Sequence, residues 1–145
     1  MVAATLALGA TPAQAATGGA STLAASEAST GSDLAFAPLR WAGATWYGPG
    51  LYGNSTACGQ VLRPQTLGVA HRNLPCGTAV RFIYRGRAIV TRVIDRGPYS
   101  LGNAWDLTHA AARALGFDQV GADLVGFAVS LEYARSSRAV RQAAR

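Results

Sequence analysis

The chain has 145 residues, about the length of a single domain, and 50% of them are hydrophobic. From residue 40 onward it has thirteen arginines, no lysine and five acids, and this net charge of +8 attracts polyanions such as cell-wall polymers, anionic membranes or nucleic acid. Nucleic-acid binding is disfavoured because the arginines are dispersed, and the two histidines and scattered acids make no metal-binding signature.

The N-terminal part, residues 1–39, contains no basic residue and is dominated by Ala, Ser, Thr and Gly. Residues 1–15 are predicted as a truncated signal peptide, because Ala13-Gln14-Ala15 fits a cleavage site although the usual basic start is missing. Its apolar stretch is too short for a transmembrane helix. Residues 16–39 are predicted as a disordered linker. We therefore expect a secreted protein without stable membrane insertion; the alternative is a disordered leader with no targeting role.

Residues 40–133 are predicted to form the folded domain, and 134–145 a basic, Arg-rich helical tail. Short β-type runs, separated by turn residues, lie at 44–48, 67–71, 78–84, 87–95 and 123–133. Arg85-Gly86 predicts a tight hairpin between the third and fourth runs. In the third run, Val80, Phe82 and Tyr84 are expected to share one face.

One short helix is predicted within 107–117. Thr108 provides an N-cap, and Gly116 fits the position that ends the helix. Several short strands, a hairpin and a lone helix indicate a compact barrel rather than a sandwich. The predicted fold is therefore an all-β barrel with one short helix, preceded by a disordered leader.

Two of the five acids after residue 39 flank one Gly/Pro/Asn loop. Asp95 ends an apolar strand, and Gly97-Pro98 turns the chain away, so the carboxylate is expected at the mouth of the sheet. Partial burial there raises a carboxyl pKa, as a general acid requires. Asp106 can line the same mouth if the loop from 96 to 104 folds back. The alternatives are an ion pair of Asp95 with Arg96 or another arginine, and stabilisation of the helix N-terminus by Asp106.

Other side chains near these turns are candidates for the same site. His71 stands at a strand end, from which its ring could reach Asp95; the alternative is a packed or hydrogen-bonded structural histidine. Aromatic residues gather at the turns: Trp46, Tyr47, Tyr52, Tyr99 and Trp105. Core packing explains some of them, and those in loops are predicted to stack on sugars, because aromatic faces complement the C–H faces of pyranose rings.

The two cysteines are Cys58 and Cys76. Given export, a disulfide is favoured, and closing a loop of this size contributes on the order of 3 kcal/mol. A catalytic thiol is the alternative, but no C-x-x-C spacing supports it.

Several ordered motifs resemble the rare lipoprotein A family: ATWYG (44–48), TACGQ (56–60), GVAHRNLPCGT (68–78), VIDRGPY (93–99) and WDLTHAAARALGF (105–117). The domain of that family is a double-psi β-barrel shared with expansins. The resemblance implies a six-stranded barrel that acts on cell-wall glycan. Characterised members are lytic transglycosylases that cleave peptidoglycan strands lacking stem peptides.

The resemblance also implies roles for individual residues. The motif histidine and the Asp of D-R-G-P fall on His71 and Asp95, and the Asp of the D-L-S motif falls on Asp106. The T-W-Y motif, which binds polysaccharide in expansins, falls on Thr45, Trp46 and Tyr47. The cysteine pair resembles secreted relatives, which also favours the disulfide.

This chain departs from the family pattern at a few points. Gln60 stands where the family often has a Glu, and Gln cannot titrate. A lipid-attachment cysteine near the N-terminus and a peptidoglycan-binding repeat after the barrel are missing from the sequence. We therefore expect a secreted protein rather than a lipid-anchored one.

Together these features predict a secreted, monomeric lytic transglycosylase that acts on peptidoglycan or another cell-wall glycan without a cofactor or metal. Either Asp95 or Asp106 is the expected general acid/base, and the other acid, with His71, orients it. The residues expected to contact the glycan are Thr45, Trp46, Tyr47, Gln60, Arg96, Tyr99 and Trp105. The alternatives are a non-hydrolytic, expansin-like module that loosens wall glycans, and an inhibitor or signalling ligand that uses the barrel as a scaffold.

Overall fold

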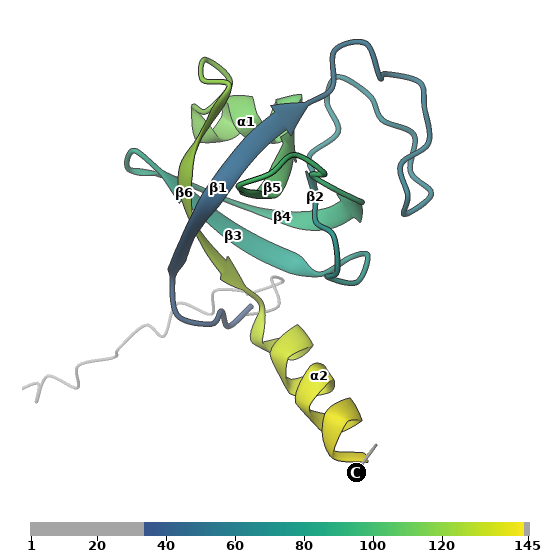
Figure 1. The fold of residues 1–145 in the computed structure, drawn as a ribbon, viewed down its shortest axis with the longest axis vertical. Helices are drawn as coiled ribbons and strands as arrows, with labels where there is room; N and C mark the ends of the chain where they lie inside the picture. The colour runs from purple at the N-terminus through teal and green to yellow at the C-terminus, as the bar shows by residue number, and fades with distance from the viewer. Residues whose placement is uncertain (1–33, 144–145) are drawn as a thin grey trace, which may run out of the picture. The chain divides into compact units, whose positions relative to one another are not determined.

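The computed structural model describes residues 34–143, so the predicted signal peptide and most of the predicted linker lie outside the described residues. Six strands form a closed barrel in the order β1-β5-β2-β4-β3-β6 (Figure 1). The strands are β1 (Arg40–Tyr47), β2 (Val69–Ala70), β3 (Ala79–Tyr84), β4 (Arg87–Asp95), β5 (Asn103–Thr108) and β6 (Ala122–Val129). This architecture confirms the predicted six-stranded barrel.

The β3–β4 hairpin follows the predicted alternation. Arg85 and Gly86 form its two-residue turn with positive φ values of 44° and 79°, as a turn matched to the strand twist requires. On β3, Val80, Phe82 and Tyr84 point into the barrel and are buried, whereas Arg81 is exposed. The strand β3 therefore gives one apolar face to the core of the barrel.

The strand β5 was not predicted, because residues 96–104 were assigned to a loop that leads directly into the helix. Asn103–Thr108 instead pair in parallel with β1 and antiparallel with β2. Trp105 and Leu107 point into the core from this strand, and Asp106 points the other way.

Two helices are present in the described residues, one at the position predicted within 107–117 and one that begins before the predicted helical tail. The helix α1 (His109–Leu115) has the predicted caps: the Thr108 side chain accepts a hydrogen bond from Ala111 N, and Gly116 adopts the left-handed conformation. The predicted last strand ends early, at Val129, because the chain continues as α2 (Leu131–Ala143). Glu132 in the first turn of α2 favours this helix start.

The end of the predicted linker contacts the barrel. Ala37 N donates to Val129 O, and Leu131 N donates to Ala35 O. Residues 35–37 therefore lie beside the end of β6.

A long connection, residues 48–68, joins β1 to β2. The predicted disulfide Cys58–Cys76 is confirmed, and it ties this connection to the turn that follows β2. Gly53 N and Leu62 N donate to Leu62 O and Asn54 O, which hold the connection against itself. A region with little regular structure is thus fixed at one end of the barrel.

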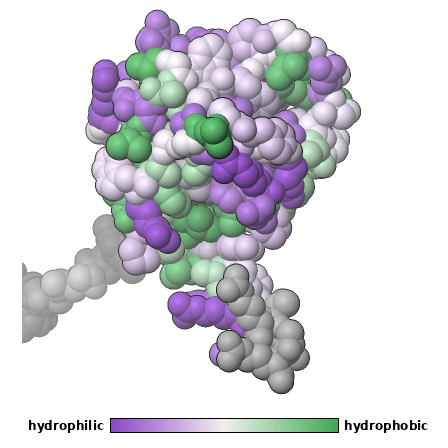
Figure 2. Space-filling view, viewed as in Figure 1, coloured by the Kyte–Doolittle hydropathy of each residue, from purple (hydrophilic) through white to green (hydrophobic). Residues whose placement is uncertain are grey.

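The described surface is chemically mixed. Figure 2 shows hydrophilic residues in purple with apolar residues in green between them. In residues 34–143, no helix is long and apolar enough to cross a membrane.

Candidate active site

The two acids meet on either side of the short strand β2. Ala70 pairs with Asp95 of β4 on one side and with Asp106 of β5 on the other. Two strand spacings separate the backbones of the acids, about 10 Å. The structure therefore brings Asp95 and Asp106 to one end of the barrel, although they are held by β2 rather than by a folded-back loop.

Asp106 is half-buried, and its Oδ1 accepts a 2.8 Å hydrogen bond from Thr45 Oγ1 on the neighbouring strand β1. Burial raises the pKa of Asp106 above its ordinary value, the Thr45 hydrogen bond opposes this shift, and the negative charge of Asp95 adds to it. Stabilisation of a helix end does not explain this position. Asp106 lies within β5, and the α1 N-terminus is capped by Thr108.

Asp95 is held by backbone donors. Its Oδ1 accepts hydrogen bonds from Ala57 N at 2.9 Å and from Arg96 N at 2.8 Å. The alternative of an ion pair with Arg96 does not hold, because the Arg96 guanidinium donates to the backbone carbonyls of His71, Leu74 and Asp95. Arg96 thereby fixes the turn after β2, a use that differs from the glycan contact predicted for it.

Tyr47 stands next to both acids. Its hydroxyl is buried and has no hydrogen-bond partner of standard geometry. Burial raises the pKa of Tyr47, and the charge of Asp95, a contact of the hydroxyl with the Asp95 carboxylate and then the charge of Asp106 raise it further. The phenol oxygen therefore lies close to Asp95 and within the electric field of both carboxylates. Tyr47 and Asp95 line a pocket of about 200 Å³, whose other walls come from the 48–68 connection: Leu51, Asn54, Ser55, Thr56 and Leu62.

His71 is linked to Asp95 through the backbone, since His71 N donates to Asp95 O. Its ring Nδ1 accepts hydrogen bonds from Asn73 N and Leu74 N, so the proton of the neutral ring sits on Nε2. The ring packs on Trp105 with centroids 4.4 Å apart. Burial lowers the pKa of His71, and two neighbouring arginines lower it further. The ring is therefore a neutral, packed group, and the charges acting on it are cationic.

Two of the residues predicted to stack on sugars make contacts within the barrel instead. Trp105 is only 1% exposed and packs against Phe82 and Phe127 in the core, so its ring cannot stack on a sugar; this prediction is wrong. Trp46 is half-buried, and its Nε1 donates to Val120 O at 2.8 Å. Tyr99, by contrast, is 81% exposed in the loop between β4 and β5.

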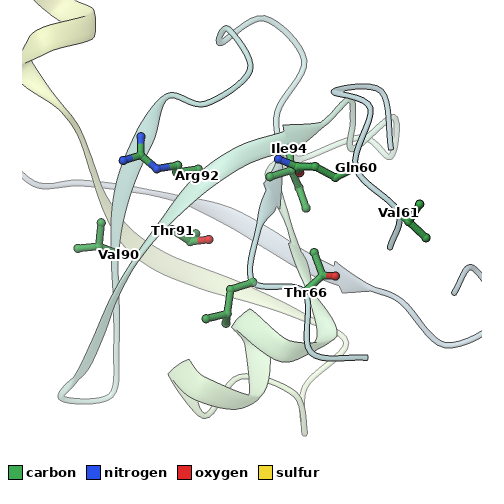
Figure 3. A pocket seen from close by; sticks show the side chains of 8 residues that line it. Gln60, Val61, Thr66, Val90, Thr91, Arg92 and Ile94 are labelled. Carbon is green, nitrogen blue, oxygen red and sulfur yellow. The ribbon is translucent and has the colours of Figure 1, made fainter. Parts of the chain in front are cut away.

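Gln60 faces a different pocket. A cavity of about 450 Å³ lies beside β4, and Gln60, Val61, Val90, Arg92 and Ile94 are among its lining residues (Figure 3). The pocket beside Asp95 has no wall from Gln60. Gln60 and Asp95 therefore line different pockets, although the sequence analysis placed both at the glycan site.

Sequence reasoning missed the donors that come from the 48–68 connection. Ala57 N binds the Asp95 carboxylate directly, and Tyr52 Oη lies 3.3 Å from His109 Nδ1. The signal that could have found Ala57 is its place beside Cys58, because the disulfide brings this segment to the turn after β2. Within residues 34–143, no group of three or more His, Cys, Asp or Glu side chains is placed to hold a metal ion.

The sequence model of the lytic transglycolase family matches residues 42–126. A probable endolytic peptidoglycan transglycosylase RlpA of Synechocystis sp. is 44% identical over 80 residues, which cover 54% of this chain and 25% of that protein. The endolytic peptidoglycan transglycosylase RlpA of Yersinia pestis is 46% identical over 74 residues, which cover 50% of this chain and 21% of that protein. The chain thus spans about a quarter of the length of these curated relatives.

Two solved structures resemble the barrel. A Streptomyces papain inhibitor aligns with a TM-score of 0.52 at 24% identity, over 66% of this chain and 96% of that chain. An expansin of Clavibacter michiganensis aligns with a TM-score of 0.51 at 22% identity, over 63% of this chain and 50% of that chain. At these identities the likeness establishes the fold alone. The predicted double-psi β-barrel and the resemblance to rare lipoprotein A are confirmed.

Proposed function

Because the chain belongs to the lytic transglycolase family, we propose that its barrel cleaves the glycan strands of peptidoglycan lytically, with Asp106 as the general acid/base. The observation that carries this proposal is the half-buried Asp106 carboxyl, whose pKa is raised by burial and by the charge of Asp95. A raised pKa keeps more of the carboxyl protonated at a given pH, as proton donation to a leaving oxygen requires.

The reaction needs only one group that gives and takes a proton. Protonated Asp106 gives its proton to the glycosidic oxygen as the bond between that oxygen and the anomeric carbon of the N-acetylmuramoyl residue breaks. The 6-hydroxyl of the same residue then attacks the anomeric carbon, and its proton passes to the Asp106 carboxylate. One product carries a new hydroxyl and the other a 1,6-anhydro ring. Because no water is consumed, no second carboxylate has to activate one.

Asp95 is proposed to stabilise the positive charge that develops at the anomeric carbon. The two N–H groups that bind its Oδ1 suit an ionised carboxylate. The buried Tyr47 hydroxyl lies beside the Asp95 carboxylate and is proposed to help hold it in place. His71 is proposed to position Asp95 through the backbone rather than to exchange protons.

The excess positive charge supports an acidic partner. The thirteen arginines give the barrel and tail a field that attracts anionic wall polymers, which would concentrate the protein on its substrate. We propose that the protein is secreted and acts as a monomer in the cell wall.

The test is a product analysis with purified protein and glycan strands stripped of stem peptides. Mass spectrometry should detect 1,6-anhydro ends with the unaltered protein and with the control variant Asp118→Asn. Asp118 lies outside the site and accepts a hydrogen bond from the Gln119 side chain. Asp106→Asn should release anhydro ends roughly 10²–10⁴-fold more slowly. Absence of anhydro ends from the unaltered protein, or full release by Asp106→Asn, contradicts the proposal.

A second candidate is non-hydrolytic loosening of wall glycans, which the net charge of +8 beyond residue 39 favours because it suits binding to anionic wall polymers. This function requires the same binding surface but no proton transfer. It predicts that the protein pellets with insoluble wall glycan while no soluble product appears in the same assay.

A further inference from the structure

We propose that the outer face of β1 carries a second glycan contact, centred on Trp41, in line with the acids at the other end of the same strand. This inference rests on the proposed function and deepens it. The contact would recognise an extended glycan strand rather than a single sugar.

The outer face of β1 leads directly from Trp41 to the acids. Residues alternate along a strand, so Trp41, Gly43 and Thr45 share the face opposite the buried Ala44. Thr45 ends this row with its hydrogen bond to Asp106. Trp41 lies four residues earlier, about 13 Å along the strand. A short oligosaccharide spans that distance, and a single sugar ring does not.

The Trp41 indole is 62% exposed, an unusual position for so large an apolar side chain. Its neighbours on the same face leave it uncovered. Gly126 pairs with Trp41 across β6, and Gly43 is the next outward residue on β1. Neither residue has a side chain that could cover the ring.

Gly43 has a structural reason to remain a glycine. A Cβ at this position would lie 2.7 Å from both Asn103 Oδ1 and Gly102 O, because the start of β5 approaches closely here. The outward space at Gly43 is therefore filled by Asn103 Oδ1 and Gly102 O rather than by a side chain of β1. A polymer that lies along β1 would meet these two acceptor oxygens between Trp41 and Thr45, and its hydroxyls would be placed to donate hydrogen bonds to them.

The surroundings suit a sugar polymer. Leu124 pairs with Gly43 and is 59% exposed, so apolar surface borders the row, while Thr45 and Asp106 supply polar groups at its end. β1 crosses the front of the barrel between β6 and β5 in Figure 1, and Figure 2 shows apolar and hydrophilic residues interspersed in that view. Glycans present both apolar C–H faces and hydroxyls, and an open aromatic face complements the former.

The experiment measures binding without cleavage, in the Asp106→Asn background of the full chain. Trp41→Ala is compared with Trp41→Phe, which keeps an aromatic face, and with Val90→Ala, which removes exposed apolar surface from β4 (Val90 is 51% exposed). Each variant is titrated with long stem-peptide-free glycan strands and with a disaccharide fragment. Sedimentation of each variant records its oligomeric state.

Trp41→Ala should weaken binding of long strands roughly tenfold, which corresponds to about 1.4 kcal/mol, and leave disaccharide binding unchanged. Trp41→Phe should retain most of the affinity, and Val90→Ala all of it. Unchanged long-strand binding by Trp41→Ala overturns the inference, as does an equal loss for both ligands. A change from dimer to monomer with Trp41→Ala would assign this face to self-association instead.

The outcomes separate the two proposals. If the Asp106→Asn protein binds glycan and Trp41→Ala binds equally well, only the inference fails. If Trp41→Ala weakens binding of long strands as expected, but the protein with Asp106 restored releases no anhydro ends, lytic cleavage fails while the Trp41 contact stands. If no variant binds glycan, both fail.

Discussion

The two pockets beside the 48–68 connection differ in size and in chemistry. The larger, of about 450 Å³, lies beside β4, and its only charged lining residue, Arg92, donates a hydrogen bond to Gly77 O. The smaller, of about 200 Å³, contains Asp95 and the unpartnered hydroxyl of Tyr47. The difference teaches that volume does not mark the reactive site. A buried hydroxyl without a hydrogen-bond partner lines both pockets, Tyr47 Oη in the smaller and Thr91 Oγ1 in the larger, so the carboxylate of Asp95 is the feature that distinguishes the smaller one.

The largest expected effect is on catalysis at Asp106, which lies across β2 from Asp95 of the smaller pocket. Asp106→Asn should reduce the rate of anhydro-end formation by roughly 10²–10⁴-fold, since proton transfer from a positioned side chain contributes that much. Gln60→Ala and Arg92→Ala, both at the larger pocket, should change the rate less than about twofold. Initial rates on stem-peptide-free strands measure all three variants. If Gln60→Ala or Arg92→Ala lowered the rate as much as Asp106→Asn, the larger pocket would be part of the catalytic site as well.

The next effect separates two tryptophans by their burial. Trp105→Ala should lower the free energy of unfolding by about 3–5 kcal/mol, because it leaves a cavity beneath the site. Trp41→Ala should change it by no more than about 0.5 kcal/mol, since that ring is largely exposed. Urea unfolding followed by circular dichroism gives both values. Equal losses would show that Trp41 is part of the packed structure.

The disulfide should contribute to both pockets, since both have walls from the 48–68 connection. Replacing Cys58 and Cys76 by Ser should lower the free energy of unfolding by about 3 kcal/mol, because the open chain gains conformational entropy when unfolded. The same variant should lose activity in the folded state, since Ala57 N would no longer be held at Asp95. Activity equal to that of the unaltered protein would show that the strands alone position the acids.

A smaller effect concerns the pH dependence of the site. Thr45→Val removes the hydrogen bond that lowers the pKa of Asp106, so that pKa should rise further. Since the proton donor must be protonated, kcat/KM should fall at a higher pH in Thr45→Val than in the unaltered protein. A pH–rate profile measures this shift. An unchanged profile, or a shift to lower pH, would exclude Asp106 as the titrating donor.

The same raised pKa has a consequence for stability. Folded protein binds the Asp106 proton more tightly than unfolded protein, so this group costs stability as pH rises above its ordinary pKa. Asp106→Asn should remove that cost and unfold at an equal or higher urea concentration at neutral pH. A lower midpoint would mean that the charged carboxylate is stabilised by contacts beyond Thr45.

Local patterns predicted the parts of the fold that depend on neighbours in sequence. The alternation of Val80, Phe82 and Tyr84 and the Arg85-Gly86 turn were sufficient for the β3–β4 hairpin, because its strands are adjacent. The strand β5 was missed because its partners are distant. Thr45 and Asp106, which pair across β1 and β5, lie 61 residues apart. The end of β6 was missed because an apolar run continues through Ser130 into α2.

Motifs located the candidate acids, but closure of the barrel decided what surrounds them. Strand ends and turns pointed to Asp95 and Asp106, and the family resemblance pointed to the same two residues. The burial of Trp105 and the carbonyl contacts of Arg96 depend on the arrangement of β5 and the turn after β2. These contacts have no local signature, so sequence reasoning placed both residues at the substrate.

The central claim is that Asp95 and Asp106 form one electrostatically coupled site in which Asp106 holds the proton. Carbon-13 NMR titration of the Asp106 carboxyl, in the unaltered protein and in Asp95→Asn, tests it most directly. The account predicts a pKa above the ordinary aspartate value in the unaltered protein, and a lower one once the negative charge of Asp95 is removed. An Asp106 pKa at or below the ordinary value, or one that does not respond to Asp95→Asn, would contradict the claim.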